Sequence, residues 1–295
     1  MKILVTGCNG YIGSHVVKSL KESGHSISGW DINVYGQYND VSKYLDNFEP
    51  VDVRTLDNKL SFDAVIHLAG LVSVEESVRL PYEYYYTNVI GTNNILDYIE
   101  TDHILFASTA SAWAMDSPYA RSKVAAEDII RQKSKSYTIF RFFNVSGTNG
   151  EFGQLGIATH LIRIVAEAAA GTRSALQVYG NDYDTRDGTC IRDYVHVEDL
   201  SDAVVYSINN GARNSKYECI GSDKGFTVLE VIKAMEKVAG KKINFNFANR
   251  RPGDSSISVV DELSTMISIK RNLEQMCLDQ YEFEIKKLGK NLNRV

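Results

Sequence analysis

The sequence has few cysteines, and they do not occur in pairs. Cys8, Cys190, Cys219 and Cys277 lie far apart, and no C-x-x-C motif is present. Disulfide frameworks and zinc sites use closely grouped cysteines, whereas isolated ones are typical of buried thiols in a reducing compartment. We therefore expect neither disulfides nor a metal site, and we expect the protein to be cytoplasmic.

Long apolar runs and a strong excess of one charge are also missing. No stretch approaches the roughly 18 apolar residues of a membrane helix. The N-terminal MKILVTGCNGYIG runs from a short apolar segment directly into glycines, unlike a signal peptide. The formal net charge of -5 gives no basic surface for nucleic acid or an anionic membrane. We expect no nucleic-acid partner and no membrane partner.

Short apolar segments alternate with helical patterns in the first half of the chain. Strands separated by helices predict a parallel sheet with helices on both faces, so the fold class is α/β with a Rossmann-type, doubly wound parallel sheet. The predicted strands are Lys2–Thr6, Ser26–Trp30, Asp63–Leu68, His103–Ser108 and Thr138–Phe142, and the predicted helices are His15–Ser23, Tyr84–Ile99 and Tyr119–Lys133.

The alternation loosens after about Asn144, which predicts a second domain. We expect a first domain over residues 1–145 and a smaller mixed α/β C-terminal domain over residues 146–295. The two are interleaved, because residues 190–210 are expected to fold back onto the first domain. The predicted elements are helices at Ile157–Ala170 and Val228–Ala239, strands at Leu176–Tyr179 and Ile243–Phe247, and a strand then a helix within Arg192–Asn209.

A glycine-rich turn joins the first predicted strand to the first predicted helix. Gly7, Gly10 and Gly13 surround Tyr11 and Ile12 in the sequence GCNGYIG. Glycines permit a tight turn and let a pyrophosphate approach the backbone, and a helix N-terminus presents N–H groups to it. We expect a dinucleotide to bind here; a purely structural turn is the alternative interpretation.

Asp31 ends the second predicted strand, about 20 residues after the glycines. A carboxylate there accepts hydrogen bonds from the adenine-ribose hydroxyls and repels a 2′-phosphate, which predicts NAD rather than NADP. A turn or helix-capping aspartate is the alternative. Asp52 and Val53 follow the next predicted strand and are further candidates for a contact with the adenine.

Tyr119 and Lys123 stand four residues apart at the start of a predicted helix. Because residues at i and i+4 share a helix face, the phenol and the ammonium group reach one pocket. A lysine charge, together with an oxidised nicotinamide, favours the phenolate, so the tyrosine can act as a base near neutral pH. The preceding strand ends in Ser108 and Thr109, with Ser111 shortly after. An exposed helix face is the alternative interpretation of the pair.

The motifs of this chain resemble those of the nucleotide-sugar 4-epimerases, above all the UDP-glucose (UDP-galactose) 4-epimerases, within the extended short-chain dehydrogenase/reductase family. The resemblance covers most of the chain and includes VIHLAGLVSVEESV, SPYARSK, RFFNVSG and RRPGD. The stretch VYGNDYDTRDGTCIRDYVHVEDL is the most specific part, because general dehydrogenases do not carry it. The resemblance implies an isomerase that uses NAD to invert C4 of a UDP-hexose through a transient 4-keto sugar.

The resemblance also implies roles for individual residues. Tyr119 is the base and acid, Lys123 its electrostatic partner, and Thr109 the hydroxyl that assists at the sugar, with Ser108 and Ser111 nearby. The NAD pocket corresponds to His67, Leu68, Ala69, Gly70, Asn88 and Lys123. The nucleotide-sugar site corresponds to Asn144, His160, Leu161, Val178, Tyr179, Arg192, Tyr194, Arg251, Asp254 and Ser258.

The side chains at three of these positions indicate what the nucleotide-sugar site would accept. Arg192 and Arg251 suit a diphosphate, because guanidinium groups pair with phosphate oxygens, although ordinary surface salt bridging is the alternative. Ser258 falls where a bulky residue restricts other family members to plain hexoses, so its small side chain implies that N-acetylhexosamine substrates are tolerated. His196 is expected to satisfy a structural hydrogen bond rather than to act in catalysis.

Several positions depart from the family pattern. Val72 replaces a lysine, His160 an asparagine, and Trp113-Ala114 a Tyr-Gly pair, before a shortened loop to Ser117.

Other functions stay open. A nucleotide-sugar reductase, dehydrogenase or dehydratase is the alternative, although no acidic residue follows Thr109 to drive dehydration. A non-catalytic sensor of NAD or sugar nucleotides is a further alternative. The resemblance also implies a homodimer formed through the helices Tyr84–Ile99 and Tyr119–Lys133.

Overall fold

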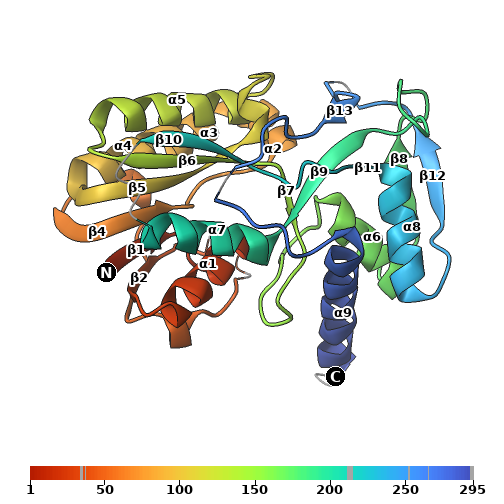
Figure 1. The fold of residues 1–295 in the computed structure, drawn as a ribbon, viewed down its shortest axis with the longest axis horizontal. Helices are drawn as coiled ribbons and strands as arrows, with labels where there is room; N and C mark the ends of the chain where they lie inside the picture. The colour runs from red at the N-terminus through yellow and green to blue at the C-terminus, as the bar shows by residue number, and fades with distance from the viewer. Residues whose placement is uncertain (34–35, 37, 211–214, 252, 265, 293–295) are drawn as a thin grey trace. The chain divides into compact units, whose positions relative to one another are not determined.

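The chain divides into two compact units in the computed structural model (Figure 1). The first unit consists of Met1–Phe142 and Ser201–Cys219, and the second of Phe143–Leu200 and Ile220–Val295. The structure describes residues 1–33, 36, 38–210, 215–251, 253–264 and 266–292. Within the segment 190–210, residues from Ser201 onward therefore belong to the first unit and those before it to the second.

A parallel sheet forms the centre of the first unit. Among the described residues it has seven strands in the order β10-β6-β5-β4-β1-β2-β3, and the pairings from β6 to β3 are parallel. Its inner strands are buried apolar runs, as a parallel sheet covered on both faces requires. The strands are β1 (Lys2–Thr6), β2 (Ser26–Trp30), β3 (Asn47–Glu49), β4 (Leu60–His67), β5 (Ile99–Thr109), β6 (Tyr137–Phe142) and β10 (Lys216–Ile220).

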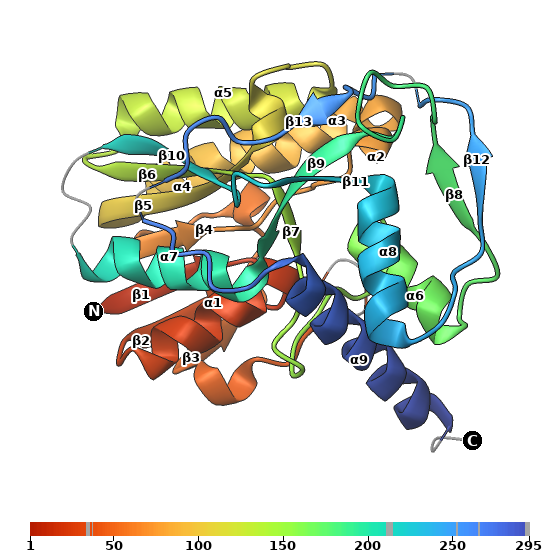
Figure 2. The same ribbon diagram turned by 45° about the vertical axis from the view of Figure 1, so that its right-hand side comes forward.

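Helices cover both faces of this sheet (Figures 1 and 2). Helix α1 (Tyr11–Glu22) and helix α7 (Val197–Asn209) lie on one face. The other face carries α2 (Val74–Arg79), α3 (Pro81–Tyr85), α4 (Gly91–Tyr98) and α5 (Pro118–Lys133). Short 3-10 turns complete the unit at η1 (Ser42–Tyr44), η2 (Val53–Thr55) and η4 (Ala110–Ala112). The prediction of a Rossmann-type, doubly wound parallel sheet is confirmed.

The long helix predicted over roughly Tyr84–Ile99 is present, and only its bounds and its regularity differ. The chain is helical from Pro81 to Tyr98, interrupted only by a π-helical turn η3 (Tyr86–Ile90) between α3 and α4, and Ile99 already belongs to β5. The π turn carries Asn88, whose side chain is held by Leu71 and Ser122. A tertiary hydrogen-bond network thus accompanies the interruption, which apolar periodicity does not reveal.

The second unit is a smaller mixed α/β structure, as predicted. Helices α6 (Leu161–Ala170), α8 (Val228–Ala239) and α9 (Leu273–Leu292) pack together around buried residues such as Val165, Met235 and Met276 (Figure 2). Strand β9 (Ile191–His196) pairs with β7 (Asn144–Ser146), β11 (Gly225–Thr227) and β13 (Ile257–Ser258), and β8 (Leu176–Tyr179) pairs with β12 (Phe245–Ala248).

The helix predicted to begin at Ile157 begins instead at Leu161. Ile157 is 89% exposed, so it contributes nothing to the core that the apolar pattern predicted. The guanidinium of Arg163 donates to the carbonyl oxygens of Leu155 and Gly156 at 3.1 and 2.6 Å, which fixes this segment as a loop. No helix in the described part of the chain combines the length and apolarity needed to cross a membrane.

Candidate active site

The glycine turn between β1 and α1 leaves no space for side chains at Gly7 and Gly13. Gly7 has a φ of +72°, and a β-carbon there would lie 2.8 Å from the backbone nitrogen of Ala69. A β-carbon on Gly13 would lie 2.0 Å from the carbonyl oxygen of Gly7. Helix α1 begins after Gly10 without a side-chain cap. The turn therefore leaves a backbone surface at the helix N-terminus, at Tyr11 and Ile12, of the kind that accepts a pyrophosphate.

Asp31 lies beside this turn. Its carboxylate accepts hydrogen bonds from the backbone nitrogens of Asn9 at 3.0 Å and Asn33 at 2.8 Å. These contacts fix the carboxylate at the carboxyl end of β2, next to the glycines, as an NAD ribose site requires.

Asp52 and Val53 have local structural partners. The Asp52 carboxylate caps η2 and forms an ion pair with Arg54 at 2.7 Å, which holds the pKa of Asp52 below its usual range. Val53 is buried, and a β-carbon on Gly91 would lie 2.8 Å from its side chain.

His67 is a structural residue under the dinucleotide turn. Thr92 donates to the carbonyl of Asn88, so His67 Nε2 must donate to the Thr92 hydroxyl at 3.0 Å. Nδ1 then accepts from Thr6 at 2.7 Å. Burial, with a smaller effect of the Lys123 charge, lowers the pKa of His67 to about 3, so the ring stays neutral. Leu68 and Ala69 follow it, and Ala69 N donates to the Thr6 hydroxyl at 3.2 Å.

Asn88 connects the loop after β4 to helix α5. Its amide accepts from the backbone nitrogen of Leu71 at 2.9 Å and donates to the carbonyl of Leu71 and the hydroxyl of Ser122. Ser122 in turn donates to the carbonyl of Tyr119. Gly70 sits against the same amide, where a β-carbon would lie 2.8 Å from Asn88 Oδ1. The residues predicted to contact the cofactor and the helix that carries Tyr119 therefore share one hydrogen-bond network.

Helix α5 begins as predicted and buries Tyr119 and Lys123 together. Ser117 caps it by accepting from Ala120 N at 3.2 Å. Tyr119 is 8% and Lys123 3% exposed, which rules out an exposed helix face. Lys123 Nζ donates to the carbonyl oxygen of Ala107 at 2.8 Å, so the ammonium is fixed at the end of β5.

The protein's own groups keep the Tyr119 phenol neutral. Burial raises its pKa, and a hydrogen bond with Thr109 only partly opposes this. Burial also lowers the pKa of Lys123 to about 8, although the nearby Glu127 carboxylate raises it. The expectation that Lys123 together with an oxidised nicotinamide favours the phenolate includes the charge of the cofactor, and it stays a prediction.

The hydroxyl residues at the end of β5 have different surroundings. Thr109 is next to Tyr119, and its hydroxyl also accepts from the backbone of Ser111 at 3.2 Å. The Ser108 hydroxyl is buried and donates to Glu127. The Ser108 hydroxyl therefore already has a hydrogen-bond partner within the protein. Sequence reasoning missed Glu127, although its spacing from Lys123 repeats the spacing of Lys123 from Tyr119.

Five of the predicted nucleotide-sugar residues form one connected group in the second unit. The guanidinium carbon of Arg251 lies 3.9 Å from the Tyr179 ring centroid, and Arg192 pairs with Asp254 at 3.5 Å. Asp254 N donates to the carbonyl of Arg251, and Ser258 lies in register with Arg192 across β13 and β9. The group offers two guanidinium ions and an aromatic face, which suit a diphosphate and a flat base.

The remaining predicted residues of this unit are more dispersed. Val178 and Tyr194 are buried in its core, and burial raises the pKa of the Tyr194 phenol. Asn144 donates to the carbonyl of Asp193 at 2.8 Å. His160 precedes α6 as an exposed residue, and Leu161 begins the helix and packs against the core.

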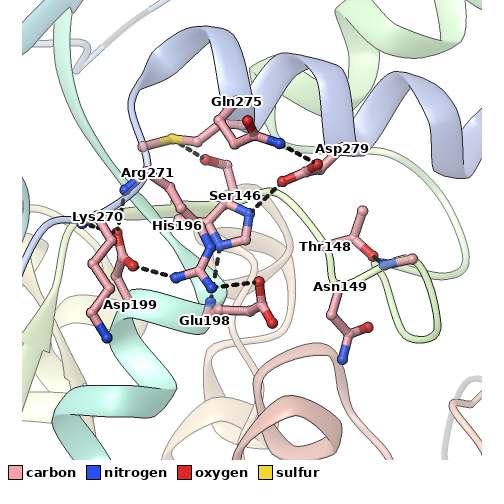
Figure 3. Close-up of polar contacts among 12 residues, drawn as sticks. Ser146, Thr148, Asn149, His196, Glu198, Asp199, Lys270, Arg271, Gln275 and Asp279 are labelled. Carbon is pink, nitrogen blue, oxygen red and sulfur yellow. Dashed lines mark hydrogen bonds and ion pairs between the residues drawn. The ribbon is translucent and has the colours of Figure 1, made fainter.

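His196 is buried and makes structural hydrogen bonds, as expected (Figure 3). Nδ1 accepts from the backbone nitrogen of Glu198, and Nε2 therefore donates to Asp279 at 3.1 Å. In the same region the buried Asp199 carboxylate pairs with Arg271 and accepts from the backbone nitrogens of Lys270 and Arg271 (Figure 3). The described residues contain no group of three metal-ligating side chains.

Comparisons with known proteins agree with this arrangement. The model of the NAD dependent epimerase/dehydratase family matches residues 3–220. The UDP-glucose 4-epimerase of Bacillus subtilis (strain 168) is 33% identical, with 96% of this chain and 97% of that protein covered. Among solved structures, UDP-glucose 4-epimerase from Bifidobacterium longum in complex with NAD+ and UDP has a TM-score of 0.87 at 30% identity, with 98% and 99% covered.

A second solved structure carries a broader substrate name. The UDP-Glc/GlcNAc 4-epimerase from Campylobacter jejuni has a TM-score of 0.78 at 31% identity, with 97% of this chain and 99% of that chain covered. The family model matches residues 3–220, and these relatives cover 96 to 98% of the chain. The chain therefore belongs to the NAD dependent epimerase/dehydratase family.

Proposed function

We propose that the protein is an NAD-dependent 4-epimerase of UDP-hexoses that interconverts UDP-glucose and UDP-galactose. The observation that carries the proposal is the burial of Tyr119 and Lys123 together at the end of β5, the strand that Thr109 ends. The same unit holds the glycine turn and Asp31. Relatives that cover nearly the whole chain are UDP-glucose 4-epimerases.

The glycine turn fits NAD on steric grounds. Gly7, Gly13 and Gly70 stand where β-carbons would collide with neighbouring atoms at 2.0 to 2.8 Å, so the backbone surface stays bare. The turn would hold the pyrophosphate, Asp31 the adenine ribose, and the residues around Asn88 and Lys123 the nicotinamide end. When bound, NAD supplies a hydride acceptor and donor for C4 of the sugar and a positive ring that favours the Tyr119 phenolate.

The chain's own residues move the proton and orient the sugar. Tyr119 Oη takes the proton from the sugar's 4-hydroxyl as the 4-keto sugar forms, and returns it to the 4-oxygen when the opposite epimer forms. Thr109 hydrogen-bonds that oxygen through its hydroxyl and, with Ser111, orients the sugar. Lys123, fixed by the carbonyl of Ala107, provides a positive charge near the phenolate while it is protonated.

The second unit binds the UDP part of the substrate in this proposal. Arg192 and Arg251 pair with the diphosphate, and Tyr179 presents a ring to the uracil. Asn144, His160, Leu161, Val178, Tyr194 and Asp254 complete this site. Ser258 leaves room for an acetamido group, so UDP-N-acetylhexosamines are also substrates. The name of the C. jejuni relative, a UDP-Glc/GlcNAc 4-epimerase, supports this extension.

Denaturing the purified protein and assaying C4 inversion tests the proposed function. We expect released NAD and interconversion of UDP-galactose and UDP-glucose without added NADH. Stoichiometric consumption of NADH or NADPH would instead indicate a reductase, and loss of water from the sugar a dehydratase. Bound NAD with no reaction on any UDP-sugar would leave a sensor as the better account.

We also propose that the protein is a homodimer. Several apolar side chains of α2 to η3 are exposed, among them Val78 at 66%, Tyr82 at 71% and Ile90 at 44%. An exposed apolar patch on the helices of the Rossmann-type unit suits a second copy of the chain. Sedimentation velocity should show a dimer in the wild type and a monomer in Tyr82→Glu.

We also propose a reducing compartment such as the cytoplasm, since the four cysteines are free thiols.

A further inference from the structure

Helix α5 buries a third polar side chain in line with Tyr119 and Lys123. Glu127 follows Lys123 by four residues, lies on the same face, and is 1% exposed. The proton transfer proposed above does not use its carboxylate. A buried carboxylate carries a large desolvation cost, so its partners indicate what it does.

The Glu127 carboxylate holds a serine and an arginine at the end of the sheet. It accepts a hydrogen bond from Ser108 Oγ at 2.5 Å and from Arg141 Nε at 3.0 Å and Nη2 at 2.5 Å. Ser108 and Arg141 are register partners across β5 and β6. One carboxylate therefore holds a residue near the end of each of two neighbouring strands, and one of them, β5, leads directly into Thr109 and Ser111.

Arg141 also contacts two aromatic rings, one of which follows the segment 109–112 in the sequence. The guanidinium carbon of Arg141 lies 4.9 Å from the ring centroid of Trp113 and 5.1 Å from that of Tyr217. Residues 109–112, which contain Thr109 and Ser111, run between Ser108 and Trp113. The Glu127–Arg141 pair consequently contacts the chain immediately before and immediately after the residues that face Tyr119.

We infer that Glu127 is a positioning residue for epimerisation, which fixes Thr109 against Tyr119 through a clamp of Glu127, Arg141, Ser108 and Trp113. The inference rests on the proposed function. Stability alone does not account for the clamp, because buried ion pairs are often no better than apolar residues of the same volume. The charge of Glu127 also raises the pKa of its neighbour Lys123, which favours the protonated ammonium.

Glu127→Gln keeps the shape of the side chain and removes the charge. We expect kcat per NAD-loaded protein to fall by about 10²-fold with KM within about threefold, because displacement by about 1 Å has costs of this size. Ser108→Ala removes only the hydroxyl and should lower kcat by about tenfold. If Glu127→Gln does not fold, Ser108→Ala carries the test.

Asp199→Asn is the matched control for lost stability. Asp199 is likewise a buried carboxylate paired with an arginine, with side-chain exposures of 1% and 25% for Asp199 and Arg271 against 2% and 17% for Glu127 and Arg141. We expect Asp199→Asn to lower Tm about as much as Glu127→Gln, with kcat per NAD-loaded protein unchanged. Equal losses of kcat in both variants would overturn the inference.

A double-mutant cycle with Thr109→Val separates positioning from general damage. If Glu127 acts by placing the Thr109 hydroxyl, Glu127→Gln should lower kcat by less than about threefold in the Thr109→Val background, because the two losses are not independent. Fully additive losses would contradict the clamp.

Fluorescence quenching of Trp113 tests the clamp without turnover. In a Trp30→Phe background, acrylamide quenching should rise by about twofold in Glu127→Gln, since Arg141 no longer holds the ring, and stay unchanged in Asp199→Asn. Unchanged quenching in Glu127→Gln would overturn the clamp. A wild type without epimerase activity would instead refute only the proposed function, because this readout needs no substrate.

Discussion

Gly70 and the Asn88 amide are in direct contact: a β-carbon on Gly70 would lie 2.8 Å from Asn88 Oδ1. The amide has no room to withdraw, because Oδ1 also accepts from Leu71 N and Nδ2 donates to Ser122. The loop after β4 and the π turn η3 therefore fit each other only when residue 70 has no side chain.

Gly70→Ala should displace the amide and weaken NAD binding. We expect the purified variant to retain less NAD and to lose about 1–3 kcal/mol of unfolding free energy, as overpacking does. Gly289→Ala is the control, because a β-carbon there meets nothing within 4 Å in helix α9, and it should leave NAD content unchanged. Full NAD content and wild-type stability in Gly70→Ala would contradict the described contact.

His67 should make the protein less stable in acid. Burial lowers its pKa from 6.5 to about 3, so between these values the unfolded chain binds a proton that the folded chain does not. The free energy of unfolding should therefore fall as the pH drops from about 6.5 toward 3, by up to about 1.4 kcal/mol per pH unit. Urea unfolding from pH 7 to 5 should give a shallower pH dependence for His67→Gln. Equal slopes would mean that His67 titrates normally in the folded protein.

The size of residue 258 should control the choice of sugar. Ser258→Tyr fills space beside Arg192 and should reduce kcat/KM for UDP-GlcNAc by about 10- to 100-fold more than for UDP-glucose, a steric difference of a few kcal/mol. Parallel assays of both substrates on the two proteins measure this. No turnover of UDP-GlcNAc by the wild type would remove the extension to N-acetyl sugars.

Much of the first unit could be predicted because its signals are local. Strands Lys2–Thr6 and Ser26–Trp30 have the predicted bounds, and the last four residues of each are buried. The turn at Gly7 was recognisable because it depends on neighbours in the sequence. The Tyr119–Lys123 pair shares a face for the same reason.

What could not be predicted depends on contacts between distant segments. The π turn carries Asn88, which bonds Leu71 and Ser122, and the delayed start of α6 accompanies hydrogen bonds from Arg163 to a loop. The hydrogen bond of the Ser108 hydroxyl to Glu127 likewise joins residues 19 positions apart. Apolar periodicity contains no information on such polar partners.

The most direct test of the account is C4 inversion by Tyr119→Phe. Phenylalanine keeps the ring but removes the oxygen that takes the proton, so turnover of UDP-galactose should fall by at least about 10²- to 10⁴-fold while bound NAD and Tm stay near wild type. A Tyr119→Phe protein that retains NAD and inverts UDP-galactose at the wild-type rate would show that another group moves the proton, and the proposed chemistry would be wrong.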